Sequence, residues 1–190
     1  MALMTGFQEV DEVIGSDGLV EFYSTDGELL SLFYHRVIAL SAPVDVVLVG
    51  ERGGLDSLLL RRLQRTFRNR GEVYLRRAFK AEDVAPTIRA MEGEEVVVVD
   101  PYHHFKGYSQ IVGAMRGREG RKFVFSLMDR ERRGSVFGLH SAHSIFKLED
   151  RGRGFKVKLI KSPTRGEVEF SYGKWEIYGR YERGLLRWIH

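Results

Sequence analysis

Glu94-Glu95-Val96-Val97-Val98-Val99-Asp100-Pro101 is the stretch on which the fold prediction rests. Four consecutive β-branched apolar residues without polar alternation are typical of a strand covered on both faces, the position of a central parallel strand in an α/β domain. Asp100 ends the run, and ligands of open α/β sheets bind beyond the carboxyl ends of the strands. In nucleotide hydrolases of the P-loop class, an acid at this position helps to hold magnesium. The alternative is that Asp100 and Pro101 only begin a turn.

The segments on both sides of this run alternate between strand and helix patterns. This alternation predicts a mainly parallel sheet with right-handed crossovers and helices on both faces. The expected strands are residues 19–23, 44–49, 73–75 and 122–128, and the expected helices are residues 5–14 with Thr5 as cap, 28–40, 55–70, 81–91 and 102–116.

The pattern changes after Asp129. Residues 144–149, 155–160 and 166–170 alternate apolar and polar side chains between glycine-rich turns, which predicts antiparallel strands that extend one edge of the sheet. Residues 174–178 are a candidate for one more strand. We expect a single domain over residues 1–190, with residues 172–190 as a C-terminal interaction extension.

The composition is that of a globular protein, with 43% hydrophobic and 29% charged residues among 190. The absence of cysteine excludes disulfides and thiolate metal sites and favours an intracellular setting. No signal-peptide pattern and no apolar run of membrane-spanning length is present. We therefore expect a soluble, cytoplasmic protein without a membrane partner.

The net charge of +4 permits nucleic-acid contact without requiring it. Two arginine clusters are candidates for nonspecific binding of nucleic acid or of an acidic partner, although charged faces are most often only solvated. The clusters are Arg61, Arg62, Arg65, Arg68 and Arg70 on an expected helix, and Arg130, Arg132 and Arg133 in an expected loop.

Large apolar residues gather near the C-terminus, where chains are normally polar. They predict a segment that either packs back on the domain or inserts into a partner: Leu185, Leu186, Trp188 and Ile189. Histidines at 103, 104, 140 and 143 could bind zinc if they converged, and ordinary polar surface is the alternative.

The segments in this order resemble the RecA-like ATPase core of the archaeal recombinase RadA and, more closely, its shorter paralog RadB. The resemblance is carried by residues 5–15, with their Thr-Gly start, by 46–54, 96–100 and 122–128, and by the later hairpins at 138–149, 157–163 and 167–170. It implies a RecA-like P-loop NTPase fold, with Glu51 in the place of the catalytic glutamate and Asp100 in that of the Walker B acid. KaiC-like proteins share this core.

The departures from the family bear most directly on function. The turn that corresponds to the P-loop has one glycine, two acids and no lysine, so it would repel a triphosphate. Its residues are Ser24, Thr25, Asp26, Gly27 and Glu28.

A second stretch, residues 50–57, keeps P-loop spacing but has Leu55 and Asp56 in place of a glycine and the lysine. Ser126-Leu127 replaces the Asn-Gln pair that ends the corresponding strand in active members. Glu51 and Asp100 are thus remnants of a catalytic site, and no cofactor is expected.

The resulting hypothesis is a non-hydrolysing RadA/RadB-like accessory subunit of DNA recombination or repair. It would pair, as a homo- or hetero-oligomer, with a RecA-like ATPase or a repair factor. One alternative is a divergent ATPase that binds ATP and magnesium. Another is a KaiC-like regulatory module without a DNA role.

Overall fold

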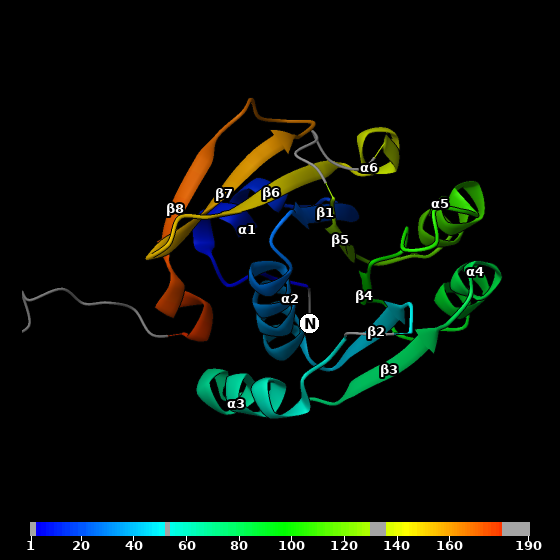
Figure 1. Cartoon of the computed structure of the whole chain (residues 1–190), viewed down its shortest axis with the longest axis horizontal. Coiled ribbons are helices and arrows are strands. Elements are labelled where there is room, and N and C mark those ends of the chain that lie inside the picture. The colour runs from blue at the N-terminus through cyan, green and yellow to red at the C-terminus, as the bar shows by residue number, and fades with distance from the viewer. Residues whose placement is uncertain (1–2, 52–53, 130–135, 180–190) are drawn as a thin grey trace, which may run out of the picture.

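The computed structural model describes residues 3–51, 54–129 and 136–179. These residues form one sheet of eight strands in the order β3-β2-β4-β5-β1-β6-β7-β8 (Figure 1). The strands are β1 (Leu19–Ser24), β2 (Val44–Val49), β3 (Val73–Ala78), β4 (Val96–Val99), β5 (Lys122–Leu127), β6 (Ser144–Asp150), β7 (Gly154–Lys161) and β8 (Glu169–Gly173). The helices are α1 (Gln8–Ile14), α2 (Gly27–Ser41), α3 (Ser57–Phe67), α4 (Ala81–Arg89), α5 (Tyr108–Arg116), α6 (Val136–Ser141) and the 3-10 helix η1 (Lys174–Tyr178).

The valine run is the strand that the sequence predicted. All four residues of β4 are buried, and the strand pairs in parallel with β2 on one side and β5 on the other. An unbroken apolar run fits this position because both faces of a central strand are covered by helices. The mainly parallel α/β fold with helices on both faces is therefore confirmed.

Two apolar clusters cover the two faces of the sheet. One contains α1 and α2, and the partly buried Leu60 of α3 packs against it, while the other contains residues of α4 and α5 (Figure 1). The side chains of β4 alternate between the clusters: Val97 and Val99 join the first, and Val96 and Val98 the second. The carboxyl ends of the parallel strands are thus held at one edge of a packed three-layer core.

The C-terminal strands depart from the prediction in two ways. β6 is not antiparallel to the core: it pairs in parallel with β1 because α6 returns the chain to the start of the sheet before it. The antiparallel pairing begins at β7 and continues in β8. Residues 174–178 form η1 rather than a strand, bounded by Gly173 and by Gly179 in the left-handed conformation.

The first predicted helix also begins later than expected. Its first residue is Gln8, and Thr5 does not cap it. The backbone N–H and the hydroxyl of Thr5 both donate to the Asp11 carboxylate, at 2.7 and 2.8 Å. Thr5 therefore orders the turn before α1 instead of starting the helix.

Arg36 of α2 is a buried cation that joins distant parts of the chain. Its guanidinium donates to the carbonyls of Thr5 and Gly6 and to those of Glu176 and Ile177, at 2.7 to 3.0 Å. Its central carbon also lies 4.3 Å from the centre of the Phe7 ring and 4.9 Å from that of Phe67. A single side chain thus ties η1 and the segment before α1 to the core. Of the helices in the described ranges, none combines the length and apolar character needed to span a bilayer.

Candidate functional site

A cavity of about 310 Å³ lies at the edge where the parallel strands end. The strands supply Leu48, Val49, Arg77, Val99, Asp100 and Leu127, the helix α2 supplies Gly27, Leu30, Ser31 and Tyr34, and Gly54 completes the lining. This is the position at which open α/β sheets bind ligands. It is also the position predicted for Asp100.

Asp100 has a constrained backbone and a partly satisfied carboxylate. Its φ of 52° lies in the left-handed region, which turns the chain sharply after β4. One carboxylate oxygen accepts a hydrogen bond from the backbone N–H of Leu127 at 2.8 Å. Burial raises the pKa of this carboxyl, and the Leu127 N–H and the nearby His103 oppose that rise. Asp100 thus links the ends of β4 and β5.

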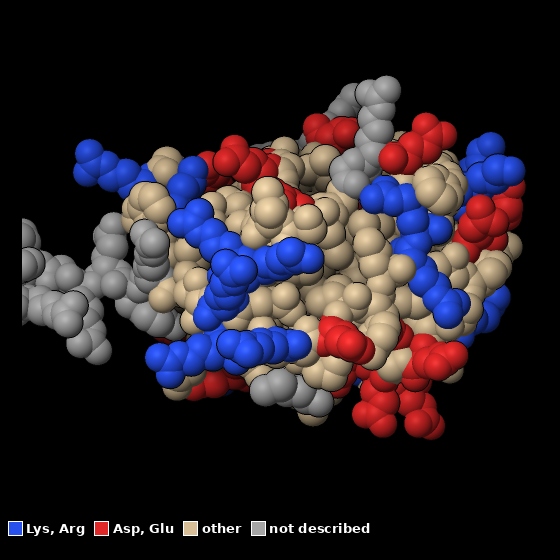
Figure 2. Space-filling model, turned by 90° about the horizontal axis from the view of Figure 1, so that it is seen from below, with Lys and Arg blue, Asp and Glu red and all other residues tan. Residues whose placement is uncertain are grey.

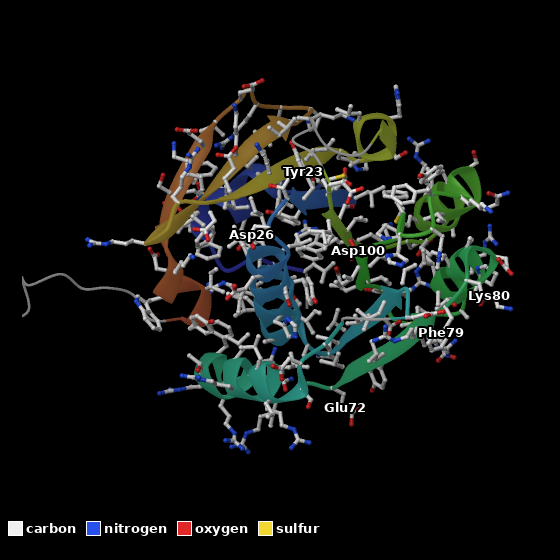
Figure 3. The ribbon with its side chains drawn as sticks, viewed as in Figure 1. Tyr23, Asp26, Glu72, Phe79, Lys80 and Asp100 are labelled. Atoms are coloured by element: carbon white, nitrogen blue, oxygen red, sulfur yellow. The ribbon has the colours of Figure 1, made fainter. Side chains whose placement is uncertain are left out.

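The N-terminus of α2, where a P-loop would hold phosphate, is closed by the chain's own carboxylate. Asp26 accepts hydrogen bonds from the backbone N–H groups of Glu28 and Leu29, at 2.9 and 3.0 Å. This is ordinary N-capping, in which a side chain satisfies groups that the first helical turn leaves free. Figure 3 shows Asp26 at the start of α2 and Asp100 at the end of β4.

The remaining residues of the loop have structural contacts or face solvent. The Ser24 hydroxyl is buried, donates to the carbonyl of Leu148 at 2.9 Å and accepts from the Asp26 N–H at 3.0 Å. Thr25, Gly27 and Glu28 are exposed. The turn from β1 into α2 is therefore a tight capped turn, with no arc of N–H groups around a hollow.

Leu127 covers the start of the same helix. A Cβ built on Gly27 would lie 3.6 and 3.7 Å from the two methyl carbons of Leu127. The sequence had identified Leu127 as part of the pair that replaces Asn-Gln. In the fold this apolar side chain stands over the helix N-terminus, where an anion would need polar partners.

Two polar residues of the cavity were not predicted. The Tyr34 hydroxyl donates to the carbonyl of Gly54 at 2.9 Å, and burial raises the pKa of Tyr34. Arg77 donates to the carbonyl of Gly50 at 2.9 Å. They lie on α2 and β3, so only the tertiary fold brings them to Asp100.

The second P-loop-like stretch is also closed by an aspartate. Asp56 caps α3 by accepting from the N–H groups of Leu58 and Leu59, at 2.8 and 3.1 Å. Glu51 is exposed and does not line the cavity of Asp100. The two predicted catalytic remnants therefore end neighbouring strands but do not share this cavity.

The other predicted residues fall in several places. The arginines at 61, 62, 65, 68 and 70 are exposed on and just after α3. Those at 130, 132 and 133, and the tail residues at 185, 186, 188 and 189, lie outside the described residues. His103 and His104 follow β4, whereas His143 precedes β6 at the opposite edge of the sheet and accepts from the N–H of Leu19. The four histidines therefore do not converge on one point.

Comparisons with known proteins add evidence about the fold. No protein-family model matches the sequence, and no curated protein matches it. Among solved structures, the chain is similar to the ATPase domain of a helicase, with a TM-score of 0.58 and 13% identity over 95% of this chain and 90% of that chain. The fold is RecA-like. At this identity the likeness supports the class of fold and not a shared activity.

Proposed function

We propose that this chain is a non-hydrolysing RadA/RadB-like protein that serves as an accessory subunit to a RecA-like ATPase in DNA recombination or repair. The observation that carries the first part is the closed N-terminus of α2. Its first N–H groups are bonded to Asp26, and Leu127 covers Gly27. A triphosphate entering here would meet a carboxylate and an apolar side chain in place of free N–H groups and a lysine.

The assignment to recombination or repair rests on the sequence resemblance to RadA and RadB. The RecA-like fold is compatible with it and also with many other activities, because one fold hosts many functions. The accessory role follows from combining the closed nucleotide site with a surface suited to a protein partner.

That surface is the free edge of β3. The strand ends the sheet order and, within the described residues, pairs only with β2. Three large apolar side chains on or next to it are about half exposed: Tyr74 at 54%, Leu75 at 49% and Phe79 at 55%. Figure 3 shows Glu72 and Phe79 at its two ends. An exposed, apolar strand edge is a template for a further strand from a partner.

The neighbouring cavity indicates what such a partner strand would carry. Its volume is about 680 Å³, and its apolar lining includes Val44, Leu75 and Met91. Its acidic lining consists of Asp45, Glu92, Glu94 and Glu95. An extended segment with an apolar anchor and a basic residue would match both parts. We assign that segment to the partner ATPase.

Calorimetric titration with ATP and magnesium tests the non-hydrolysing state. We expect no binding heat in the micromolar range from the wild type or from Asp100→Ala. Micromolar binding that is lost in Asp100→Ala would overturn the proposal and support the divergent ATPase, whose cavity would then use Asp100 and Arg77.

Affinity capture tests the accessory role. The tagged full-length chain is used as bait in an extract of its source organism, and the captured proteins are identified by mass spectrometry. We expect a RecA-like ATPase with wild-type bait and at least a tenfold loss with Leu75→Lys, since a lysine would have to be desolvated at the strand edge. Leu139→Lys, at an exposed apolar residue of α6, is the matched control. If no RecA-like ATPase is captured, or if both variants capture it equally, the assignment of the β3 edge is wrong.

A further inference from the structure

The outward face of α3 carries arginines that lack acidic partners. Arg61, Arg62, Arg65 and Arg68 are exposed, and no ion pair within the described residues involves them. Arg61 and Arg65 lie one helical turn apart, a spacing at which like charges destabilise a helix. Figure 2 shows Lys and Arg side chains gathered on the part of this face over α3. A bound polyanion would remove this repulsion.

A hollow with two aromatic side chains lies beside these arginines. It measures about 320 Å³ and is lined by Leu59, Arg62, Leu63, Thr66, Trp175 and Tyr178. Trp175 is 53% exposed, and its ring lies 6.1 Å from that of Tyr178. A half-exposed tryptophan in a short 3-10 helix adds little to the core. It is well placed to offer a ring face to a ligand.

The arginines and the hollow form one continuous surface. Arg62 belongs to both, and at about 100° per residue Arg65 and then Arg61 follow it around the helix. Leu58, which is 77% exposed, lies between Arg62 and Arg65 on this helical projection. The arginines extend about 10 Å along the axis of α3, from Arg61 to Arg68.

We propose that this α3–η1 surface binds single-stranded nucleic acid. The arginines contact successive phosphates, and an unpaired base enters the hollow and stacks on Trp175. Cationic side chains that follow a backbone, next to aromatic rings that take bases, are the common means of binding single strands without sequence preference. A duplex would satisfy only the arginines, because its stacked bases cannot reach the hollow. This inference does not depend on the non-hydrolysing state or on the β3 edge.

Fluorescence anisotropy with the full-length chain tests the proposal. The probes are labelled oligo(dT), oligo(rU) and a DNA duplex, each titrated over a range of salt. We expect the single strands to bind more tightly than the duplex. Four phosphate contacts predict a slope of log affinity against log salt of about −3 for the single strands. The oligo(dT) and oligo(rU) titrations distinguish DNA from RNA as the preferred strand.

Variants separate the two parts of the surface. Arg62→Gln/Arg65→Gln should weaken binding and reduce the salt slope by about 1.4. Trp175→Ala should weaken binding about tenfold at every salt concentration without changing the slope, and Trp175→Phe should restore most of it. Arg89→Gln/Arg165→Gln removes the same charge from exposed positions on α4 and before β8, and should have little effect.

The outcomes that would overturn the proposal are equally specific. One is the absence of binding to every probe at low salt. Another is an equal loss in the two double-arginine variants, which would assign the binding to net charge. A third is duplex preference with an unchanged affinity in Trp175→Ala. Circular dichroism and thermal unfolding of each variant exclude loss of fold as the cause.

Discussion

Asp26 shows how one residue can have two meanings in a sequence. In the P-loop position it was expected to repel phosphate, which is an electrostatic argument that needs a phosphate nearby. In the fold it also caps α2 through the N–H groups of Glu28 and Leu29. The cap could have been predicted, because aspartate directly before a helix is among the best N-caps.

Replacing Asp26 should therefore destabilise the fold. Asp26→Ala leaves two N–H groups without their acceptor and should lower the free energy of unfolding by about 1 kcal/mol. Asp26→Asn keeps a capping oxygen and should cost less than half as much. Urea unfolding followed by circular dichroism measures both. Equal stability of the wild type and Asp26→Ala would show that the cap contributes nothing.

Asp100 should make stability depend on pH in a direction opposite to that of most acids. Burial raises its pKa in the folded state, so the folded chain holds this proton more tightly than the unfolded chain does. Its contribution is therefore fully present below the unfolded pKa of about 4 and is lost as pH rises through the folded pKa.

Thermal unfolding of Asp100→Asn across pH tests this effect. The asparagine oxygen can still accept from the Leu127 N–H, and the side chain no longer ionises. The Tm of the variant relative to the wild type should rise as pH increases from below about 4 toward neutrality. Parallel Tm curves would mean that Asp100 titrates as it does in the unfolded chain.

At the scale of elements, the strands were predicted better than the ends of the helices. The bounds of β2 and β4 follow from continuous apolar runs, which leave no other register. The helix expected over residues 102–116 begins at Tyr108, because Phe105 and Gly107 adopt left-handed conformations before it. For η1, the alternation of Trp175 and Ile177 suggested a strand, whereas the glycines on both sides close a single short turn.

The candidate site was predicted in part. Asp100 and Leu127 could be placed because each follows a recognisable strand. Tyr34 and Arg77 could not, since a long helix and an edge strand meet at this cavity only through tertiary packing. No local pattern in the sequence marks either residue.

Arg36 should be the most sensitive charged residue of the helices. Arg36→Ala would leave the carbonyls of Thr5, Gly6, Glu176 and Ile177 without their donor and open a cavity between two rings. We expect a loss of about 3 kcal/mol or more in urea unfolding. Arg36→Lys should recover only part of it, because an ammonium lacks the planar fork. A loss below about 1 kcal/mol would contradict this role.

At the scale of the whole molecule, the two proposed surfaces use different elements and different chemistry. The β3 edge offers unpaired backbone and apolar side chains beside an acidic cavity, whereas the α3–η1 surface offers arginines and aromatic rings. A protein partner and a nucleic acid could therefore be held at the same time.

This separation predicts independent losses of binding. Leu75→Lys should lose capture of the partner and keep its affinity for oligo(dT), while Arg62→Gln/Arg65→Gln should show the reverse. The two assays, applied to both variants, give the result directly. If either variant loses both activities with its fold intact, the surfaces are coupled.

The closed N-terminus of α2 also has an evolutionary consequence. Regaining a nucleotide site would require a longer glycine-rich loop, a lysine, the loss of the Asp26 cap and a polar residue in place of Leu127. Removal of the cap alone lowers stability before any nucleotide can bind. Single substitutions toward an ATPase thus lead through less stable intermediates without function. This barrier would keep a lineage that has lost the P-loop from returning to it.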